Sequence, residues 1–248
     1  MMLHKIESGL FRLGLISDDY IMRRNLIEDV DLEYDAVREH WDDDAIKVHG
    51  DTSPEVLEKY ANNIANVMKL TQEDVLLCVG CGDGQVDSYL QDKVGALYGF
   101  DFAPSKVDAA RKNNPKGHYF IQSFLEKYLC PAGGERINKI YSSSVAQYCK
   151  PEDLHWFIEL QVVFLKENGG GVIGHLDVPD RAKAKCYYNR FSEATIHKYQ
   201  DKLRQIFADG SYWHSMELFI SIGKRLGLEV IIQDAQCNYR SDVLLYLK

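Results

Sequence analysis

A glycine-rich loop and one aspartate are the residues in this sequence whose types and spacing are best suited to bind a ligand. Three alternate glycines, from Gly80 to Gly84, follow the apolar run 75–79 directly. Glycine lets a backbone turn sharply and approach a ligand with no Cβ in the way. Asp101 ends the next apolar run, where a carboxylate can accept both hydroxyls of a ribose. Together these features predict a site for a nucleotide-like ligand.

Two other interpretations of these residues are open. A dinucleotide fingerprint has the spacing G-x-G-x-x-G, but here Gln85 occupies the place of the last glycine. This departure disfavours an oxidoreductase that uses a nicotinamide cofactor. The plainest alternative is a tight strand–helix turn, with Asp101 as an ordinary helix cap before Pro104.

The elements that would position these residues alternate along the chain after Thr71. Short apolar runs between helical patterns predict a doubly wound, mostly parallel sheet of the Rossmann-like α/β class. The last two runs are joined by a link too short for a crossover helix, so they should form an antiparallel pair in a seven-stranded sheet. The predicted strands are 75–79, 96–100, 118–121, 140–144, 171–176, 228–233 and 243–247, and the helices are 84–94, 104–113, 151–167 and 212–226.

Two segments flank or interrupt this pattern. Residues 1–70 indicate an N-terminal helical lid, including a helix that opens at Pro54, whereas 71–248 form the ligand-binding domain. A helical insertion, 179–210, follows the fifth strand and is rich in Lys, Arg and Tyr. Because ligands bind at the carboxyl ends of strands in doubly wound sheets, the insertion is expected to lie over the pocket.

The motifs of this chain resemble those of the class I methyltransferases that use S-adenosylmethionine (SAM). Segment 76–84 reads L-L-C-V-G-C-G-D-G, close to the family motif V-L-D-x-G-C-G-x-G, with Cys78 in place of the acidic residue. Segment 165–171, L-K-E-N-G-G-G, is similar to the family's L-K-P-G-G turn. The resemblance covers 71–248, and the N-terminal part matches loosely.

The resemblance implies SAM as cofactor and assigns residues to it. Asp101 would hold the ribose, Phe102 would flank the adenine, and Gln122, where the family often has Asp, would lie at the adenine edge. Trp41 in the lid would reach the cofactor, or would simply pack on the core beside Val37. The full predicted set is Gly80, Cys81, Gly82, Asp101, Phe102, Gln122, Ser123, Phe124, Ser143 and Trp41.

Methyl transfer requires an aligned acceptor and, for an oxygen or an amine, a base. Tyr148, His175 and Asp177 are the catalytic candidates because they follow the fourth and fifth predicted strands. Alternation along a strand would place His175 and Asp177 on one face. The alternative is a buried, hydrogen-bonded histidine and an aspartate that caps a loop. Three residues of the insertion could contact the substrate or lie on a plain surface helix: Tyr187, Tyr188 and Arg190.

Composition narrows the class of partner. The formal net charge is −8 and the pI about 5.5, which disfavours nucleic acid as the main partner. No apolar run approaches the ~20 residues that span a bilayer, and no signal-peptide core opens the chain. The six cysteines are scattered without a metal-binding pattern, so we expect no metal site and reduced thiols in the cytoplasm.

The sequence therefore predicts a SAM-dependent methyltransferase acting on an O or N atom of a small molecule. The composition of the insertion would suit an anionic or sugar-like acceptor, and the protein would be a monomer or a homodimer. Two alternatives remain at this point. One is a methyltransferase for RNA or protein, and the other is a protein that binds SAM without catalysis.

Overall fold

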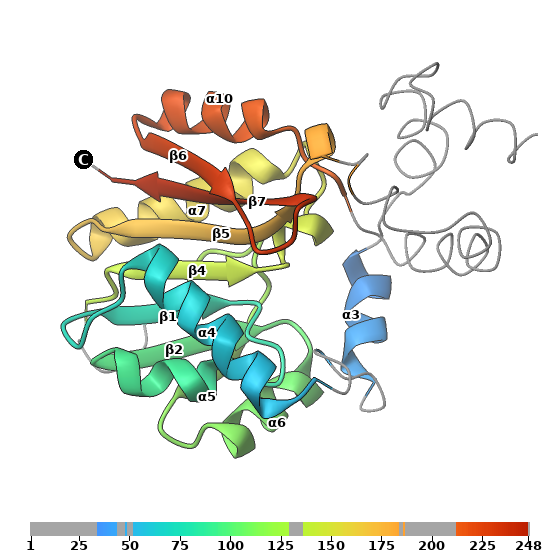
Figure 1. Cartoon of the computed structure of the whole chain (residues 1–248), viewed down its shortest axis with the longest axis vertical. Coiled ribbons are helices and arrows are strands. Elements are labelled where there is room, and N and C mark those ends of the chain that lie inside the picture. Colours follow the sequence, from blue (N-terminus) through green and yellow to red (C-terminus); the bar gives the residue numbers. More distant parts are fainter. Residues whose placement is uncertain are drawn as a thin grey trace, which may run out of the picture.

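The computed structural model describes residues 34–43, 48, 52–128, 136–183, 186 and 212–247 (Figure 1). The part of the predicted lid that precedes Tyr34, residues 1–33, lies outside these ranges. So does most of the predicted helical insertion, including Tyr187, Tyr188 and Arg190. Within the described part, no helix is both long and apolar enough to cross a membrane.

A seven-stranded sheet forms the centre of the molecule, with strand order β3-β2-β1-β4-β5-β7-β6. The first five strands run parallel to their neighbours, and β7 is antiparallel to both β5 and β6. The predicted fold class, including the antiparallel pair at the C-terminal end, is therefore confirmed. The strands are β1 (Val75–Val79), β2 (Ala96–Asp101), β3 (His118–Ile121), β4 (Lys139–Ser143), β5 (Val172–Pro179), β6 (Glu229–Asp234) and β7 (Arg240–Tyr246).

Helices cover both faces of the sheet because alternate strand residues are apolar on each side. On one face, α4 (Pro54–Met68), α5 (Asp87–Leu90) and α6 (Pro104–Asn113) pack on Leu76, Leu97 and Leu244. On the other face, α7 (Leu154–Glu167) and α10 (Met216–Leu226) pack on Leu77, Ile140 and Leu245. Two separate cores result, and they fix the positions of the strand ends that carry the site.

Three elements differ in extent from the sequence-based prediction. The helix expected over 84–94 is reduced to α5 and a 3₁₀ turn, Gln91–Lys93, because Gly84 has a left-handed φ of +70° that no α-helix contains. The helix expected from Tyr212 begins at Met216, because the residues before it pack in a loop against β5. Strand β5 continues to Pro179 beyond a register shift between His175 and Val178.

The predicted insertion begins and ends at one place on the sheet. Asp180 and His214 form an isolated parallel bridge, and the His214 backbone N–H donates to Pro179 O over 3.0 Å. The Arg181 N–H donates in turn to His214 O at 2.9 Å. We call these four residues the insertion stem. They hold the two chain segments together beside the end of β5.

Helix α3 (Tyr34–Asp42) stands beyond the carboxyl ends of the parallel strands (Figure 1). The Tyr34 hydroxyl donates to Asp153 Oδ2 at 2.6 Å and accepts from the Lys150 N–H at 3.1 Å. At the other end of the helix, Asp42 Oδ1 accepts the Ser105 N–H at 2.7 Å. These contacts tie α3 to the N-terminal ends of α6 and α7, so α3 covers the sheet edge where the site lies.

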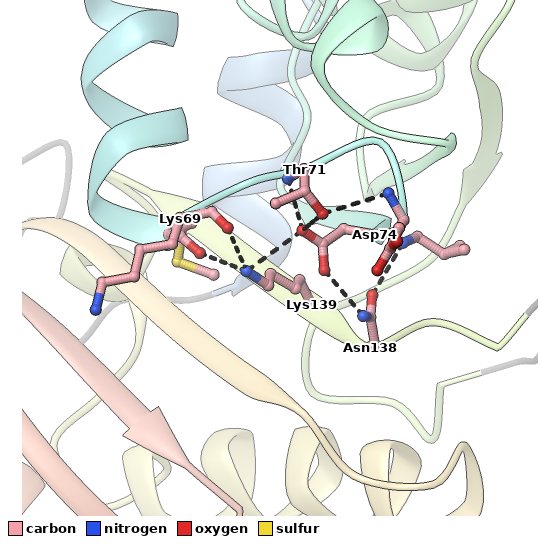
Figure 2. A network of polar contacts seen from close by, with 8 residues as sticks. Lys69, Thr71, Asp74, Asn138 and Lys139 are labelled. Carbon is pink, nitrogen blue, oxygen red and sulfur yellow. Dashed lines mark hydrogen bonds and ion pairs between the residues drawn. The ribbon is translucent and has the colours of Figure 1, made fainter.

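The opposite, amino-terminal edge of the sheet is closed by a polar network (Figure 2). Asp74 Oδ2 accepts the Thr71 N–H at 2.7 Å and lies 3.4 Å from Lys139 Nζ, while Oδ1 accepts from Asn138 Nδ2 at 2.9 Å. Lys139 also donates to the backbone oxygens of Met68 and Lys69. Both oxygens of this carboxylate are therefore bonded within the protein, and the network joins α4 to β1 and β4.

Candidate functional site

The glycine loop joins the end of β1 to the neighbouring strand. The N–H groups of Gly80 and Cys81 both donate to Phe100 O, at 2.9 and 3.0 Å. Gly80 has φ +71°, and a Cβ there would collide with Val145. Only glycine fits this position without strain, and the tight turn leaves the loop backbone facing open space above the sheet.

Asp101 ends β2 and holds the other side of this loop. Its Oδ2 accepts the Gly82 N–H at 3.0 Å, and its Oδ1 accepts the Ala103 N–H at 3.0 Å. Burial raises the pKa of Asp101, although these amide hydrogen bonds act in the opposite direction. Each oxygen keeps a free lone pair, so the carboxylate can still accept hydrogens from a bound sugar.

A cavity of about 600 Å³ lies over the carboxyl ends of the strands. This volume falls within the range of roughly 300 to 1,000 Å³ that is common for small-molecule sites. It contains no metal-like cluster of three or more His, Cys, Asp or Glu side chains within the described chain. The predicted cofactor and catalytic residues that line it are Trp41, Gly80, Cys81, Gly82, Asp101, Phe102, Gln122, Phe124, Ser143, Tyr148 and Asp177.

One end of the cavity is formed by residues that follow β3. Gln122 Nε2 donates to Lys127 O at 3.2 Å, but its buried Oε1 has no partner among the described residues. Ser123 is absent from the described lining, and its hydroxyl accepts the Leu125 N–H at 3.3 Å instead. Phe124 packs at the wall. This end therefore offers one unsatisfied acceptor between aromatic surfaces.

Aromatic side chains from two elements cover the cavity. Trp41 of α3 meets Tyr148 edge-to-face, with ring centroids 6.0 Å apart. Both contact a small cluster that also contains Phe102 and the buried Val37. Trp41 thus packs beside Val37 and lines the cavity at once, which joins the two interpretations that the sequence left open.

The other end of the cavity lies where β4 and β5 finish. Ser144 and Asp177 both adopt left-handed backbone conformations, with φ +56° and +57°, which non-glycine residues seldom do. Ser144 Oγ donates to Asp177 Oδ2 at 3.0 Å, and Arg240 lies 3.4 Å from the same oxygen. Such strained positions concentrate at functional sites. Tyr60 of α4 shares a short hydrogen bond with Ser143 on the same wall.

Gln147 is a site residue that the sequence did not reveal. It lies on a 3₁₀ turn after β4, lines the cavity, and is 8% exposed. Its Oε1 is buried with no partner among the described residues, while its backbone oxygen accepts the Tyr212 N–H. An unsatisfied buried acceptor costs about 1–3 kcal/mol, which a ligand hydrogen would recover. Its only sequence signal is a position after the fourth strand.

His175 lies away from this wall. It is fully buried, its Nδ1 pairs with Ser142 Oγ at 2.9 Å, and its ring packs against Phe157 and Phe219. It is not among the described lining residues. The register shift and the left-handed Asp177 separate the two side chains, so the expectation that they share one face is wrong. Burial, followed by the nearby His214, lowers the pKa of His175 to about 3, so its ring is neutral.

The arrangement fits an adenosyl ligand. Gly80 leaves room where a Cβ would collide, Asp101 keeps lone pairs for the ribose hydroxyls, and the orphaned Gln122 Oε1 can accept from an exocyclic amine. When bound, SAM supplies a methyl group already activated on a sulfonium.

Comparison with known proteins identifies a known domain in part of the chain. Residues 77–173 match the family model for a methyltransferase domain. No curated protein matches the sequence.

Similar solved structures establish the fold, at low sequence identity. Magnesium protoporphyrin IX methyltransferase from Synechocystis PCC 6803, with bound S-adenosylhomocysteine (SAH), has a TM-score of 0.57 at 12% identity and covers 86% of this chain and 98% of its own. The plantazolicin methyltransferase BpumL with SAH gives 0.57 at 14%, over 86% and 95%. DesVI from Streptomyces venezuelae gives 0.54 at 15%, over 77% and 92%. Part of the chain thus matches a methyltransferase domain, and its fold is that of solved methyltransferases, some of which hold SAM or SAH.

Proposed function

We propose that this protein transfers the methyl group of SAM to an oxygen or nitrogen atom of a small-molecule acceptor. The supporting observation is the continuity of the cavity. It runs from Gln122 and Asp101 past the glycine loop to Gln147 and Asp177. One continuous cavity therefore carries groups for an adenosyl ligand and, beside them, polar groups for a second molecule.

We assign the methyl donor to the part of the cavity near Gln122 and Asp101. Asp101 binds the ribose hydroxyls, Phe102 and Phe124 flank the adenine, and Gln122 Oε1 accepts from its amino group. The loop backbone at Gly80, Cys81 and Gly82, together with Ser143, borders the rest of the donor. The aromatic cover formed by Trp41 excludes water from the reacting atoms. Ser123 supports the turn rather than touching the ligand.

The acceptor lies against Asp177, Tyr148 and Gln147. A lone pair of the acceptor atom forms the bond to the methyl carbon while the carbon–sulfur bond breaks, and the acceptor loses its proton. Asp177 is the residue placed to take that proton, directly or through Ser144. His175 has no part in the proposal because it is enclosed in the core.

A small acceptor is favoured over RNA by the charge of the chain and by the size of the cavity. The chain carries a net charge of −8, and the cavity lining has three acids, Asp87, Asp101 and Asp177, and two lysines, Lys59 and Lys106. Two of the similar structures are methyltransferases of magnesium protoporphyrin IX and of plantazolicin, which supports an acceptor other than RNA. We also propose a cytoplasmic location, supported by the free state of all five described cysteines.

The full chain should bind SAH in isothermal titration calorimetry and should show no heat with NAD. Transfer of radiolabelled methyl from SAM is then measured on a panel of amine and hydroxyl metabolites, with tRNA and a basic protein as competing acceptors. Transfer to a metabolite alone supports the proposal. Absence of SAH binding, or transfer to RNA alone, contradicts it, and SAH binding with no transfer to any acceptor favours a non-catalytic role.

A further inference from the structure

The floor of the cavity holds a carboxylate with no positively charged partner among the described residues. Asp87, the first residue of α5, lines the cavity together with Cys78 of β1 and Tyr141 of β4, which are neighbours in the sheet. Asp87 is 1% exposed. Its Oδ1 accepts a short hydrogen bond from Tyr141, and its Oδ2 accepts from the Tyr119 hydroxyl at 3.0 Å. The Cys78 thiol also hydrogen-bonds to Asp87, so the side-chain donors to this buried carboxylate are two phenols and a thiol, all of them neutral.

The other two carboxylates of the lining have different partners. Asp101 accepts two backbone N–H groups, and Asp177 lies 3.4 Å from the guanidinium of Arg240. A buried carboxylate is costly unless it is paired with a cation or strongly hydrogen-bonded. Asp87 is the lining acid whose charge the described protein leaves without a counter-ion.

The residues around Asp87 do not supply a positive charge. Burial raises the pKa of the Cys78 thiol and of the Tyr141 hydroxyl well above their usual values, so both stay neutral. Burial also raises the pKa of Asp87, to about 6, although the phenolic hydrogen bonds act against this. Near pH 8 the carboxylate is therefore an anion in a poorly hydrated place, and nearby Asp83 adds to the negative potential.

The position of Asp87 relative to the donor follows from the sheet order. Asp101 ends β2, and β3 lies on the far side of β2, so the adenosine extends over β2 and β3. The remaining part of the donor must then extend over β1 and β4, toward α5. Cys78 and Tyr141 lie on these two strands, directly beside Asp87.

We propose that Asp87 provides the negative charge that binds the ammonium group of the methionine part of SAM, with Tyr119 and Tyr141 as positioning residues. An ammonium is the cation that this end of the donor carries, and it would give Asp87 the counter-ion it lacks. The inference rests on the proposed placement of the donor, because Asp101 must hold the ribose for the amino-acid part to reach Asp87.

The test compares two ligands on the full chain by calorimetry at pH 8. SAH carries the ammonium, whereas an SAH analogue with hydrogen in place of the amino group lacks it. The wild-type protein should bind SAH at least 10-fold more tightly than this analogue. In Asp87→Asn, SAH affinity should fall to that of the analogue, and analogue affinity should stay within about twofold.

Asp92→Asn is the matched control. It removes one acidic charge five residues away, from an exposed side chain that pairs with Lys116 Nζ at 3.2 Å and is not in the described lining. Its affinities for both ligands should match wild type. Tyr119→Phe removes one phenolic donor but keeps the carboxylate, so it should retain most of the preference for SAH.

Equal affinity of the wild-type protein for SAH and the analogue would overturn the proposal, and this measurement does not depend on any variant folding. An equal loss of both ligands in a folded Asp87→Asn would assign the residue a purely structural role. Failure of the wild type to bind SAH at all would instead contradict the proposed function. The two failures are thus distinguishable.

Discussion

Buried carboxylates lie at both ends of the parallel strands, but they differ in the partners that the protein gives them. At the amino-terminal edge, Asp74 is bonded through both oxygens to Thr71, Asn138 and Lys139 (Figure 2). At the carboxyl-terminal edge, Asp87 has neutral hydroxyl and thiol partners, and Gln122 leaves an acceptor without a partner among the described residues. One edge has its polar groups paired within the protein, whereas the other keeps polar groups that a ligand would pair.

The pKa values of these carboxylates also differ between the two edges of the sheet. Burial alone would raise the pKa of Asp74, but the Thr71 N–H, the charge of Lys139 and the Asn138 amide lower it overall. Burial raises the pKa of Asp87 and Asp101 despite their hydrogen bonds. The Asp74 network therefore adds stability at neutral pH, whereas the carboxylates of the cavity cost stability until a ligand arrives.

The largest expected effect is a loss of stability when the polar network at the amino-terminal edge is broken. Asp74→Ala leaves Lys139 without its carboxylate and Asn138 without its acceptor, and should lower the free energy of unfolding by about 4 kcal/mol. Urea denaturation measures the loss. The folded fraction should bind SAH with unchanged affinity, because Asp74 lies at the other end of the strands. A weakened SAH affinity would mean that the two edges are not independent.

The second prediction concerns ligand binding at the carboxyl-terminal edge. Asp101→Ala removes the proposed ribose acceptor and should weaken SAH binding at least 100-fold, about 3 kcal/mol, by calorimetry. Asp108→Ala in α6, the helix that follows β2, removes an exposed acid paired with Arg111 and serves as the control. Its SAH affinity should be unchanged. Retained affinity in Asp101→Ala would remove the basis for placing the donor here.

The third prediction concerns pH and the histidines under the cavity. Burial lowers the pKa of His175 to about 3 and that of His214 to about 4, below the unfolded value near 6.5. The unfolded chain thus binds more protons below pH 6.5, and stability falls as pH drops from 6.5 toward 4. By pH 5 each histidine should account for about 2 kcal/mol of lost stability.

His175→Met should remove about half of this pH-dependent loss between pH 7 and pH 5. Urea denaturation of both proteins at the two pH values measures it. An unchanged pH dependence in the variant would show that His175 is not held neutral in the fold, and would reopen its catalytic interpretation.

The smallest expected effect comes from relieving backbone strain at one residue of each edge. Lys69, at the amino-terminal edge, and Ser144, at the carboxyl-terminal edge, both have positive φ, 49° and 56°. Lys69→Gly should raise thermal stability by up to about 1 kcal/mol and leave methyl transfer unchanged. Ser144→Gly relieves the same strain but loses the bond to Asp177, so methyl transfer should fall. Equal activity in both variants would contradict a role for Ser144.

The local signals in the sequence predicted most of the fold. The bounds of β1, β3, α4 and α6 were given by apolar runs and by proline at the first helical turn. The ends of α5 and α10 were not, because left-handed Gly84 and the packing of Tyr212 depend on contacts distant in sequence.

The site was less accessible to prediction. Gly80 and Asp101 stand in a recognisable motif, so their lining of the cavity could be anticipated. Asp87, Gln147 and Tyr60 reach the same cavity from three different elements, and no local pattern relates them. An acid next to the apolar Val86 was the one available hint of a buried carboxylate.

The insertion stem has a consequence for how new specificity could be engineered. Because Asp180 and His214 are bridged, the chain leaves and rejoins the sheet at the insertion stem. The stem lies close to Gln147. Lengthening a loop between fixed ends costs little, about 0.6 kcal/mol for each doubling. A change in chain length between these two fixed segments should therefore cost little stability, which makes the insertion stem a suitable place at which to alter the proposed substrate choice.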